Sequence, residues 1–309
     1  MQLPEHIRTA AEEHAAGFDR KELMAAAASI SAVYRAGKAD GSVIAGKPAE
    51  CAAYAAVRMP ATFAAVSTAL EHALTHYHGK IRSAADTGAG TGAAACAVSE
   101  LTDVSELHCY ERESEMRKLG EKLTGHDWFP LDITRESLPR SYDLITAAYV
   151  LNELTEADRA RVIAGLWEKT DGMLLIVEPG TMKGYANILQ ARKLLTGAGA
   201  KIAFPCPEIS ECPLPEGDWC HFTARAARSK LHKQLKGGDV PYEDEKFSCI
   251  AAVRGEASPC KGRILRHPQI SSGFVELHLC TADGISDIKV TKKSPQFKAA
   301  RKADSGDDI

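Results

Sequence analysis

The loop 204–221 is rich in proline and cysteine, and its thiols could bind a metal. It carries Cys206, Cys212 and Cys220 in the spacing C-x5-C-x7-C. Thiolates on an irregular backbone turn inward around a soft metal more easily than thiolates on a helix. A fourth ligand is needed, and Cys280 in the segment VELHLC is the best candidate. The alternatives for this position are Cys249, Cys260 and His221.

The spacing of these cysteines bears on which metal they would hold. Zinc sites usually contain close C-x2-C pairs, and the sequence has none. This favours an iron–sulfur cluster over zinc, although spacing alone leaves both open. Other cysteines are expected to be small buried residues without a ligand role, and these are Cys51, Cys96 and Cys109.

A glycine-rich turn at 85–92, ADTGAGTG, follows an expected strand and precedes an expected helix. Glycines allow a tight turn, and the helix N-terminus favours an anionic group. The spacing G-x-G-x-G differs from the G-x-G-x-x-G of dinucleotide-binding enzymes. Glu111 ends the second expected strand, where an acid can accept both ribose hydroxyls, and Asp132 ends the third, where it could meet an adenine amino group. Together these features indicate a nucleoside-containing cofactor, whereas the turn alone could be structural.

Basic residues are concentrated between 222 and 236, a segment without acids that we expect to be a helix. Arg225, Arg228, His232 and Lys236 would share one side of it at i, i+3, i+7 and i+11. Such side chains hold the phosphates of nucleic acids. A solvated surface without a partner is the alternative interpretation.

The composition is that of a globular protein. Of 309 residues, 45% are hydrophobic and 26% charged, which excludes a disordered or fibrous chain. The net charge is −3, yet residues 221–309 hold 16 Lys and Arg against 11 Asp and Glu, so an anionic partner is expected there. No apolar run reaches the about eighteen residues of a transmembrane helix, and the first residues lack the pattern of a targeting peptide. We therefore expect a cytoplasmic protein, in which clustered thiols hold metal more often than they form disulfides.

The elements that must position these residues follow from the hydrophobic periodicity. The alanine-rich N-terminal part predicts helices near 4–16, 19–37, 47–58 and 61–77, with a break at Gly37–Gly41. From Ile81 onward, apolar strand patterns alternate with helical ones, which predicts a doubly wound, mostly parallel sheet. The expected strands are IRSAADTG, LHCYERE, WFPLDIT, YDLITAAYVLNEL and GMLLIVEPG, and KFSCIAAVR is a later candidate.

The chain thus divides into three expected parts. Residues 1–78 form an N-terminal helical segment, and residues 79–254 form an α/β core. Residues 255–309 form a small C-terminal β subdomain and tail, because short alternating runs in 261–293 are typical of an antiparallel sheet.

The register of glycine turn and acids resembles the class I S-adenosylmethionine-dependent methyltransferases over about residues 79–254, with their Rossmann-like core. The resemblance implies that Asp86, Gly88 and Gly90 surround the methionine moiety of the cofactor, while Glu111 binds its ribose and Asp132 its adenine. It also implies an acceptor site at the end of the fourth strand. The side chains there, as candidate catalytic residues, are Tyr149, Asn152 and Glu153. The family's motifs for holding a base nitrogen or attacking a pyrimidine ring are absent from this position.

Further segments resemble the mitochondrial small-ribosomal-subunit assembly family of methyltransferase-like proteins and its bacterial relatives. They are LITAAYVLNEL, IVEPGTMKGY, CPEISECPLPEGDWCHF, EDEKFS and VELHLCTADG, and the resemblance covers about residues 50–305. It implies a [4Fe–4S] cluster on Cys206, Cys212, Cys220 and Cys280, and association with the small subunit and its ribosomal RNA. We expect a bacterial member that is a monomer away from the ribosome.

Three functions remain open at this point. The chain could methylate ribosomal RNA, or it could be a non-catalytic RNA-binding assembly factor that keeps the cofactor. It could also be a methyltransferase for small molecules in which the cysteine site is only structural.

Overall fold

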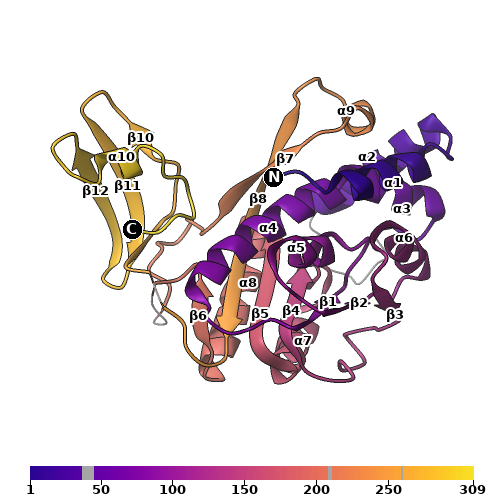
Figure 1. Ribbon diagram of the computed structural model, residues 1–309, viewed down its shortest axis with the longest axis horizontal. Coiled ribbons are helices and arrows are strands. Elements are labelled where there is room, and N and C mark those ends of the chain that lie inside the picture. Colours follow the sequence, from indigo (N-terminus) through magenta and orange to yellow (C-terminus); the bar gives the residue numbers. More distant parts are fainter. Residues whose placement is uncertain (37–44, 208–210, 259) are drawn as a thin grey trace.

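The centre of the molecule is an eight-stranded sheet with the order β3-β2-β1-β4-β5-β8-β6, and β7 pairs with β8 beside this path. The computed structural model describes residues 1–36, 45–207, 211–258 and 260–309 (Figure 1). The strands are β1 (Ser83–Thr87), β2 (Glu106–Tyr110), β3 (Asp127–Phe129), β4 (Tyr142–Ala148), β5 (Thr170–Pro179), β6 (Lys201–Phe204), β7 (Phe222–Ala227) and β8 (Tyr242–Val253). Strands β1 to β5 pair in parallel, and β8 runs antiparallel to its neighbours. The predicted Rossmann-like class I methyltransferase fold is confirmed.

Helices cover both faces of the sheet because alternate strand residues point to opposite sides. Leu144 and Leu175 pack with α5 (Ala93–Leu101) and α6 (Ser114–Thr124) in one apolar cluster. The next residues along the same strands, Ile145 and Ile176, pack with α7 (Glu156–Glu168) and α8 (Met182–Gly197) in another. The order in which the chain adds strands reverses between β1 and β4: β2 and β3 lie on one side of β1, and β4 and β5 lie on the other. In folds of this kind, ligands bind at such a reversal point.

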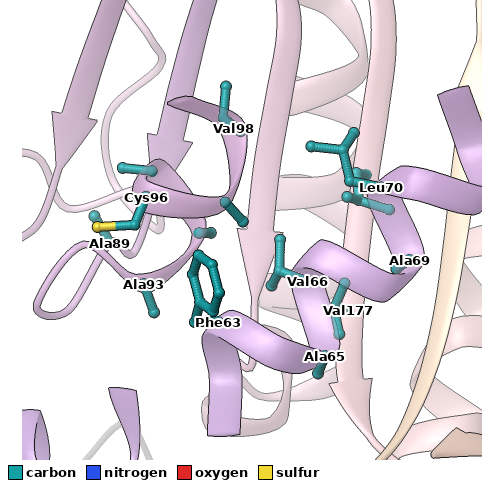
Figure 2. Packing of buried hydrophobic residues seen from close by; sticks show 14 of the residues in the cluster. Phe63, Ala65, Val66, Ala69, Leu70, Ala89, Ala93, Cys96, Val98 and Val177 are labelled. Atoms are coloured by element: carbon teal, nitrogen blue, oxygen red, sulfur yellow. The ribbon is translucent and has the colours of Figure 1, made fainter. Parts of the chain in front are cut away.

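The predicted N-terminal helices are confirmed. They are α1 (Glu5–Ala15), α2 (Arg20–Ala36), α3 (Pro48–Val57) and α4 (Met59–His76). The predicted break at Gly37–Gly41 lies outside the described residues. Alanines let α4 approach the sheet and α5 closely, and Figure 2 shows Phe63, Val66 and Leu70 of α4 gathered with Cys96 and Val98 of α5. The last N-terminal helix therefore belongs to the core.

The helix predicted over 222–236 is wrong. Residues 222–227 alternate between buried and exposed, the period of a strand, and form β7, in which Arg225 pairs with Asp244 of β8. Only Lys230–Lys236 is helical, as α9 at the tip of the hairpin. There Leu235 packs against α2 and α3, which fixes the hairpin tip to the N-terminal helices (Figure 1).

The C-terminal residues form the predicted antiparallel sheet. Its strands are β9 (Gly262–Ile264), β10 (Gln269–Ile270), β11 (Phe274–Thr281) and β12 (Gly284–Thr291), followed by the short helix α10 (Phe297–Ala300). Arg263 is fully buried and fastens this sheet to the core, because its guanidinium donates to the Pro205 carbonyl at 3.0 Å and to the Gly306 carbonyl at 2.7 Å. Among the described helices, none has the length and apolarity to span a bilayer.

Candidate cofactor pocket and cysteine cavity

A pocket opens at the carboxyl ends of β1, β2 and β4, at the reversal point of the sheet. It brings together five of the residues predicted from the sequence, although they come from four separate segments. These are Gly88, Glu111, Asp132, Tyr149 and Glu153. The pocket is completed by Tyr54, Arg112, Leu131, Ile133, Thr134, Ala148, Val150 and Leu154.

Gly88 of the glycine turn and Glu111 line this pocket, whereas the predicted Gly90 is not among its lining residues. Gly88 and Gly90 have φ angles of 64° and 57°, in the left-handed region that favours glycine. The Glu111 carboxylate accepts hydrogen bonds from the backbone N–H groups of Gly90 and Glu113, each at 2.9 Å. Burial raises the pKa of Glu111, and these two hydrogen bonds oppose that effect. Glu111 therefore holds the glycine turn in place in addition to facing the pocket.

Gly88→Ala is expected to lower the free energy of unfolding by about 2–4 kcal/mol, from left-handed strain and overpacking together. A Cβ at Gly88 would lie 2.6 Å from Cγ2 of Val150. Gly125→Ala is the matched control, because Gly125 has a φ angle of 68° but no atom within 4 Å of such a Cβ. In urea denaturation, Gly125→Ala should lose only the part of the free energy of unfolding that left-handed strain costs. Equal losses in the two variants would show that Val150 simply moves aside.

Asp86 lies beneath the glycine turn and is not among the residues that line the pocket. It is 1% exposed, and its carboxylate accepts from the Thr146 hydroxyl at 2.8 Å and the Ala95 N–H at 3.1 Å. Burial raises the pKa of Asp86 to about 7 against the effect of these hydrogen bonds. Its visible role is to join β1, β4 and the first turn of α5.

Asp132 lies three residues beyond β3 and also lines the pocket. Its Oδ1 accepts from the backbone N–H and the hydroxyl of Thr134 at 3.0 and 2.6 Å. Partial desolvation acts to raise the pKa of Asp132, but the hydrogen bonds from Thr134 and the nearby Arg112 and Arg135 lower it overall. This carboxylate is ionised and can accept hydrogen bonds from a ligand.

The predicted acceptor end is built on an unusual backbone. Tyr149 follows β4 with a φ angle of 62°. Within the described part of the chain, it is the only residue other than glycine that has a positive φ angle. Its hydroxyl donates to Oε1 of Glu245 at 2.8 Å, and Arg58 forms an ion pair with that carboxylate at 3.0 Å. Strained residues of this kind cluster at functional sites. The Tyr149 hydroxyl is thus engaged by Glu245, whereas the tyrosine itself lines the pocket.

The other two acceptor-side residues lie in the short 3-10 helix Leu151–Glu153. Glu153 lines the pocket, and burial together with nearby carboxylates raises its pKa to about 8. Asn152 is 9% exposed and is not among the lining residues. Of the three predicted catalytic side chains, the structure therefore brings Tyr149 and Glu153 to the pocket.

Sequence reasoning missed Tyr54, Arg112 and the partners of Tyr149. Tyr54 comes from α3 and lies beside the glycine turn, where its ring would be 3.8 Å from a Cβ added at Gly90. It is the one aromatic residue of the alanine-rich helix α3, and this contrast in the sequence could indicate a functional position. Glu245 lies in the segment EDEKFS, which the family resemblance had marked without giving it a role.

A second cavity brings together the four cysteines predicted as metal ligands. Cys206 follows β6, Cys212 and Cys220 lie in the loop before β7, and Cys280 is in β11. All four line a cavity of about 760 Å³, part of it open to solvent, and Cys249 of β8 lines it as well. Within the predicted loop 204–221, residues 208–210 lie outside the described part of the chain.

Two side chains from α8 contact these thiols. The Tyr185 hydroxyl lies 3.1 Å from Sγ of Cys212, and Nε of Arg192 donates to Sγ of Cys206 at 3.4 Å. Burial raises the pKa of Cys280 to about 12 and also raises that of Cys220. In the residues that the structure describes, no three His, Cys, Asp or Glu side chains converge closely enough to hold a metal ion. A metal site at these cysteines therefore stays a prediction.

The four basic residues predicted to share a helix face do not share one, because 222–227 is a strand. Arg225 in β7 forms a bidentate ion pair with Asp244 at 2.8 and 3.1 Å, and Arg228 donates to the Gly237 carbonyl at 2.8 Å. His232 is fully buried, and Nζ of Lys236 lies 2.7 Å from Glu243. Arg225, Arg228 and Lys236 thus have partners within the hairpin, with Arg225 still exposed, and His232 is buried away from any external partner.

A groove between the β7–β8 hairpin and the C-terminal sheet brings Arg225 together with three further basic side chains. Arg225 and Lys246 lie on the exposed hairpin face, and Arg266 and His267 face them from the segment after β9. The remaining lining residues are His221, Thr223, Asp244, Leu265, Asp304 and Ser305. This groove adjoins the cysteine loop, since Arg266 contacts Asp218 and the Trp219 carbonyl.

Comparison with solved structures finds methyltransferases of low sequence identity. Magnesium protoporphyrin IX methyltransferase from Synechocystis, solved with bound SAM, is 14% identical with a TM-score of 0.41, covering 73% of this chain and 91% of that one. A TehB-like SAM-dependent methyltransferase from Corynebacterium glutamicum is 14% identical with a TM-score of 0.40, covering 62% and 88%.

The human protein named "Ribosome assembly protein METTL17, mitochondrial" is 30% identical over an alignment of 260 residues, and the match covers 75% of this chain. The alignment spans 55% of that relative's length, so the chain matches about half of it. The family model described as mitochondrial small ribosomal subunit Rsm22 matches residues 48–309. Because this match covers most of the sequence, including the pocket and the cysteine cavity, the chain belongs to the Rsm22 family.

Proposed function

We propose that this chain is a SAM-binding, iron–sulfur-containing methyltransferase-like protein that associates with ribosomal RNA and assists maturation of the small ribosomal subunit. The observation that carries the proposal is the family match over residues 48–309, together with a human relative named as a ribosome assembly protein. The pocket and the cysteine cavity support its chemical parts.

For SAM, the support is the composition of the pocket at the reversal point of the sheet. Glu111 would accept the ribose hydroxyls and Asp132 the adenine amino group, while Gly88 leaves room for close backbone approach. When bound, SAM supplies an electrophilic methyl group. Tyr54 lines the pocket from α3 and would help to exclude water from the bound cofactor.

For the cluster, the support is the donor set around the cysteine cavity. Four thiols from the loop and from β11 surround one space, as the four ligands of a [4Fe–4S] cluster do. Metal binding displaces thiol protons, and Arg192 beside Cys206 would stabilise the resulting negative charge. Zinc is the alternative occupant, and it would need the four sulfurs to converge to about 2.3 Å from one ion.

For RNA, the support is the basic groove beside the hairpin rather than the predicted helix face. Lys246 and Arg225 project from neighbouring strands on the exposed face, and Arg266 lies across from them. A non-catalytic assembly role is favoured by one observation at the acceptor end, where Glu245 engages the Tyr149 hydroxyl. Methyl transfer to RNA is then the second candidate function.

The test is binding of small-subunit ribosomal RNA over a series of salt concentrations. We expect affinity to fall steeply with salt, and Arg225→Ala with Lys246→Ala to flatten the log–log slope by about two. Lys118→Ala with Lys122→Ala on α6 removes the same charge elsewhere and should leave the slope unchanged. Transfer of labelled methyl groups from SAM to that RNA would identify an enzyme. Absence of RNA binding would favour a methyltransferase for small molecules.

A further inference from the structure

The wall of the cofactor pocket is acidic and aromatic. Its charged lining residues are three carboxyl side chains and one guanidinium, namely Glu111, Asp132, Glu153 and Arg112, and its aromatic residues are Tyr54 and Tyr149. Excess carboxylate and the faces of aromatic rings both attract a cation. The charge and the aromatic rings of the lining therefore favour a ligand that places a positive charge inside the pocket.

Most of these charged groups are already committed. The Glu111 carboxylate accepts two backbone hydrogen bonds, and Asp132 accepts from Thr134. Arg112 donates to Glu113 at 3.0 Å. Within the part of the chain that the structure describes, the Glu153 carboxyl makes no hydrogen bond or ion pair. Glu153 is thus the pocket acid without a partner among the described residues, whereas Glu111 and Asp132 also accept hydrogen bonds from the protein.

The groups that face Glu153 from the neighbouring elements decide its charge. The pKa of Glu153 is raised to about 8, chiefly by desolvation and further by Glu111, Glu178 and Glu113, while Arg112 acts to lower it. A cation held in the pocket would favour the ionised carboxylate. Binding of such a cation should therefore release a proton below pH 8, whereas a neutral ligand should not.

We propose that Glu153 is a specificity-determining residue, which makes the pocket prefer the charged sulfonium of the methyl donor to the neutral thioether of its demethylated product. This inference rests on the proposed binding of SAM. The two ligands share the adenosine and amino-acid groups and differ at the sulfur by one methyl group and one positive charge. Glu111, Asp132 and the glycine turn would bind both alike, so discrimination must come from a group that senses the charge. Because the demethylated product would bind more weakly than the methyl donor, fresh donor could displace it from the site.

The test measures the affinities of SAM and S-adenosylhomocysteine by calorimetry at pH 6 and pH 9. In the parent protein the preference for SAM should be larger at pH 9, where Glu153 is ionised. Glu153→Gln should reduce that preference about tenfold at pH 9, the effect of one partly screened charge pair, and change it little at pH 6. The ionisable groups of the ligands are the same in both experiments, so their titration cancels when the parent protein and Glu153→Gln are compared at one pH.

Two controls separate this inference from the proposed function. Glu156→Gln removes an exposed carboxylate three residues away and should leave the preference intact. At pH 7, SAM binding to the parent protein should release protons, measured in two buffers of different ionisation enthalpy, and binding of the product should not. Binding of both ligands with an unchanged ratio in Glu153→Gln would overturn the inference alone. Failure of the parent protein to bind either ligand would overturn the proposed cofactor and the inference together.

Discussion

Protein purified without oxygen is expected to contain about four iron atoms per chain, and Cys280→Ser is expected to abolish them. Cys280 is the decisive position because it lies in β11, more than fifty residues from the other three thiols, and lines the same cavity only in the folded chain. Serine supplies a hard hydroxyl where the cluster needs a soft thiolate. Iron analysis and the visible absorbance of the cluster are the measurements.

The matched control is Cys249→Ala. Cys249 lines the same cavity from β8 and is buried, but it is not one of the four proposed ligands. This variant should therefore keep its iron. Stoichiometric zinc without iron would contradict the iron–sulfur cluster but would be compatible with the same four ligands. Iron retained in Cys280→Ser would show that Cys280 is not a ligand.

Loss of the cluster should also loosen the C-terminal sheet. The bonds to Cys206, Cys212 and Cys220 on one side and Cys280 on the other would hold β11 against the core, so that their free energy adds to folding. The buried Arg263 makes the second attachment between these parts. Limited proteolysis of the apo protein should accordingly cut first near residues 261–293.

The core of the fold could be predicted from the sequence because its strands are buried on both faces. Such strands appear as continuous apolar runs, of which MLLIV in β5 is the clearest, and long helices separate them. The segment 222–227 was misassigned because FTARAA satisfies both a helical and a strand period over six residues. Pairing with β8, which lies fifteen or more residues further on, decides between the two.

The site was predictable where it depends on strand ends. Gly88, Glu111 and Asp132 each follow a strand of the parallel sheet, so their spacing along the chain places them at one edge. Tyr54 and Glu245 reach the pocket and its support from helix α3 and strand β8, and no local spacing relates them to β4. Asp86 fits the motif but its side chain points into the packing, which a pattern of residue types does not reveal.

Glu245→Gln is expected to lower the free energy of unfolding by about 3 kcal/mol, because it removes the carboxylate that neutralises Arg58. The two side chains retain only 11% and 16% exposure, so the guanidinium would be left largely buried beside an uncharged amide. The same carboxylate accepts the Tyr149 hydroxyl, which steadies the left-handed backbone at the pocket. Urea denaturation measures the loss.

Two further variants identify what Glu245 contributes. Tyr149→Phe removes only the hydroxyl and should cost about 1 kcal/mol, since the ion pair with Arg58 stays. Asp244→Asn, at the neighbouring position of β8, removes a carboxylate whose partner Arg225 is exposed, and it should change stability little. If Glu245→Gln lost no more than Asp244→Asn, the buried ion pair would not hold α3 and α4 to the hairpin. The conformation of Tyr149 would then have to be fixed by the packing of β4 and by its N–H bond to the Val177 carbonyl alone.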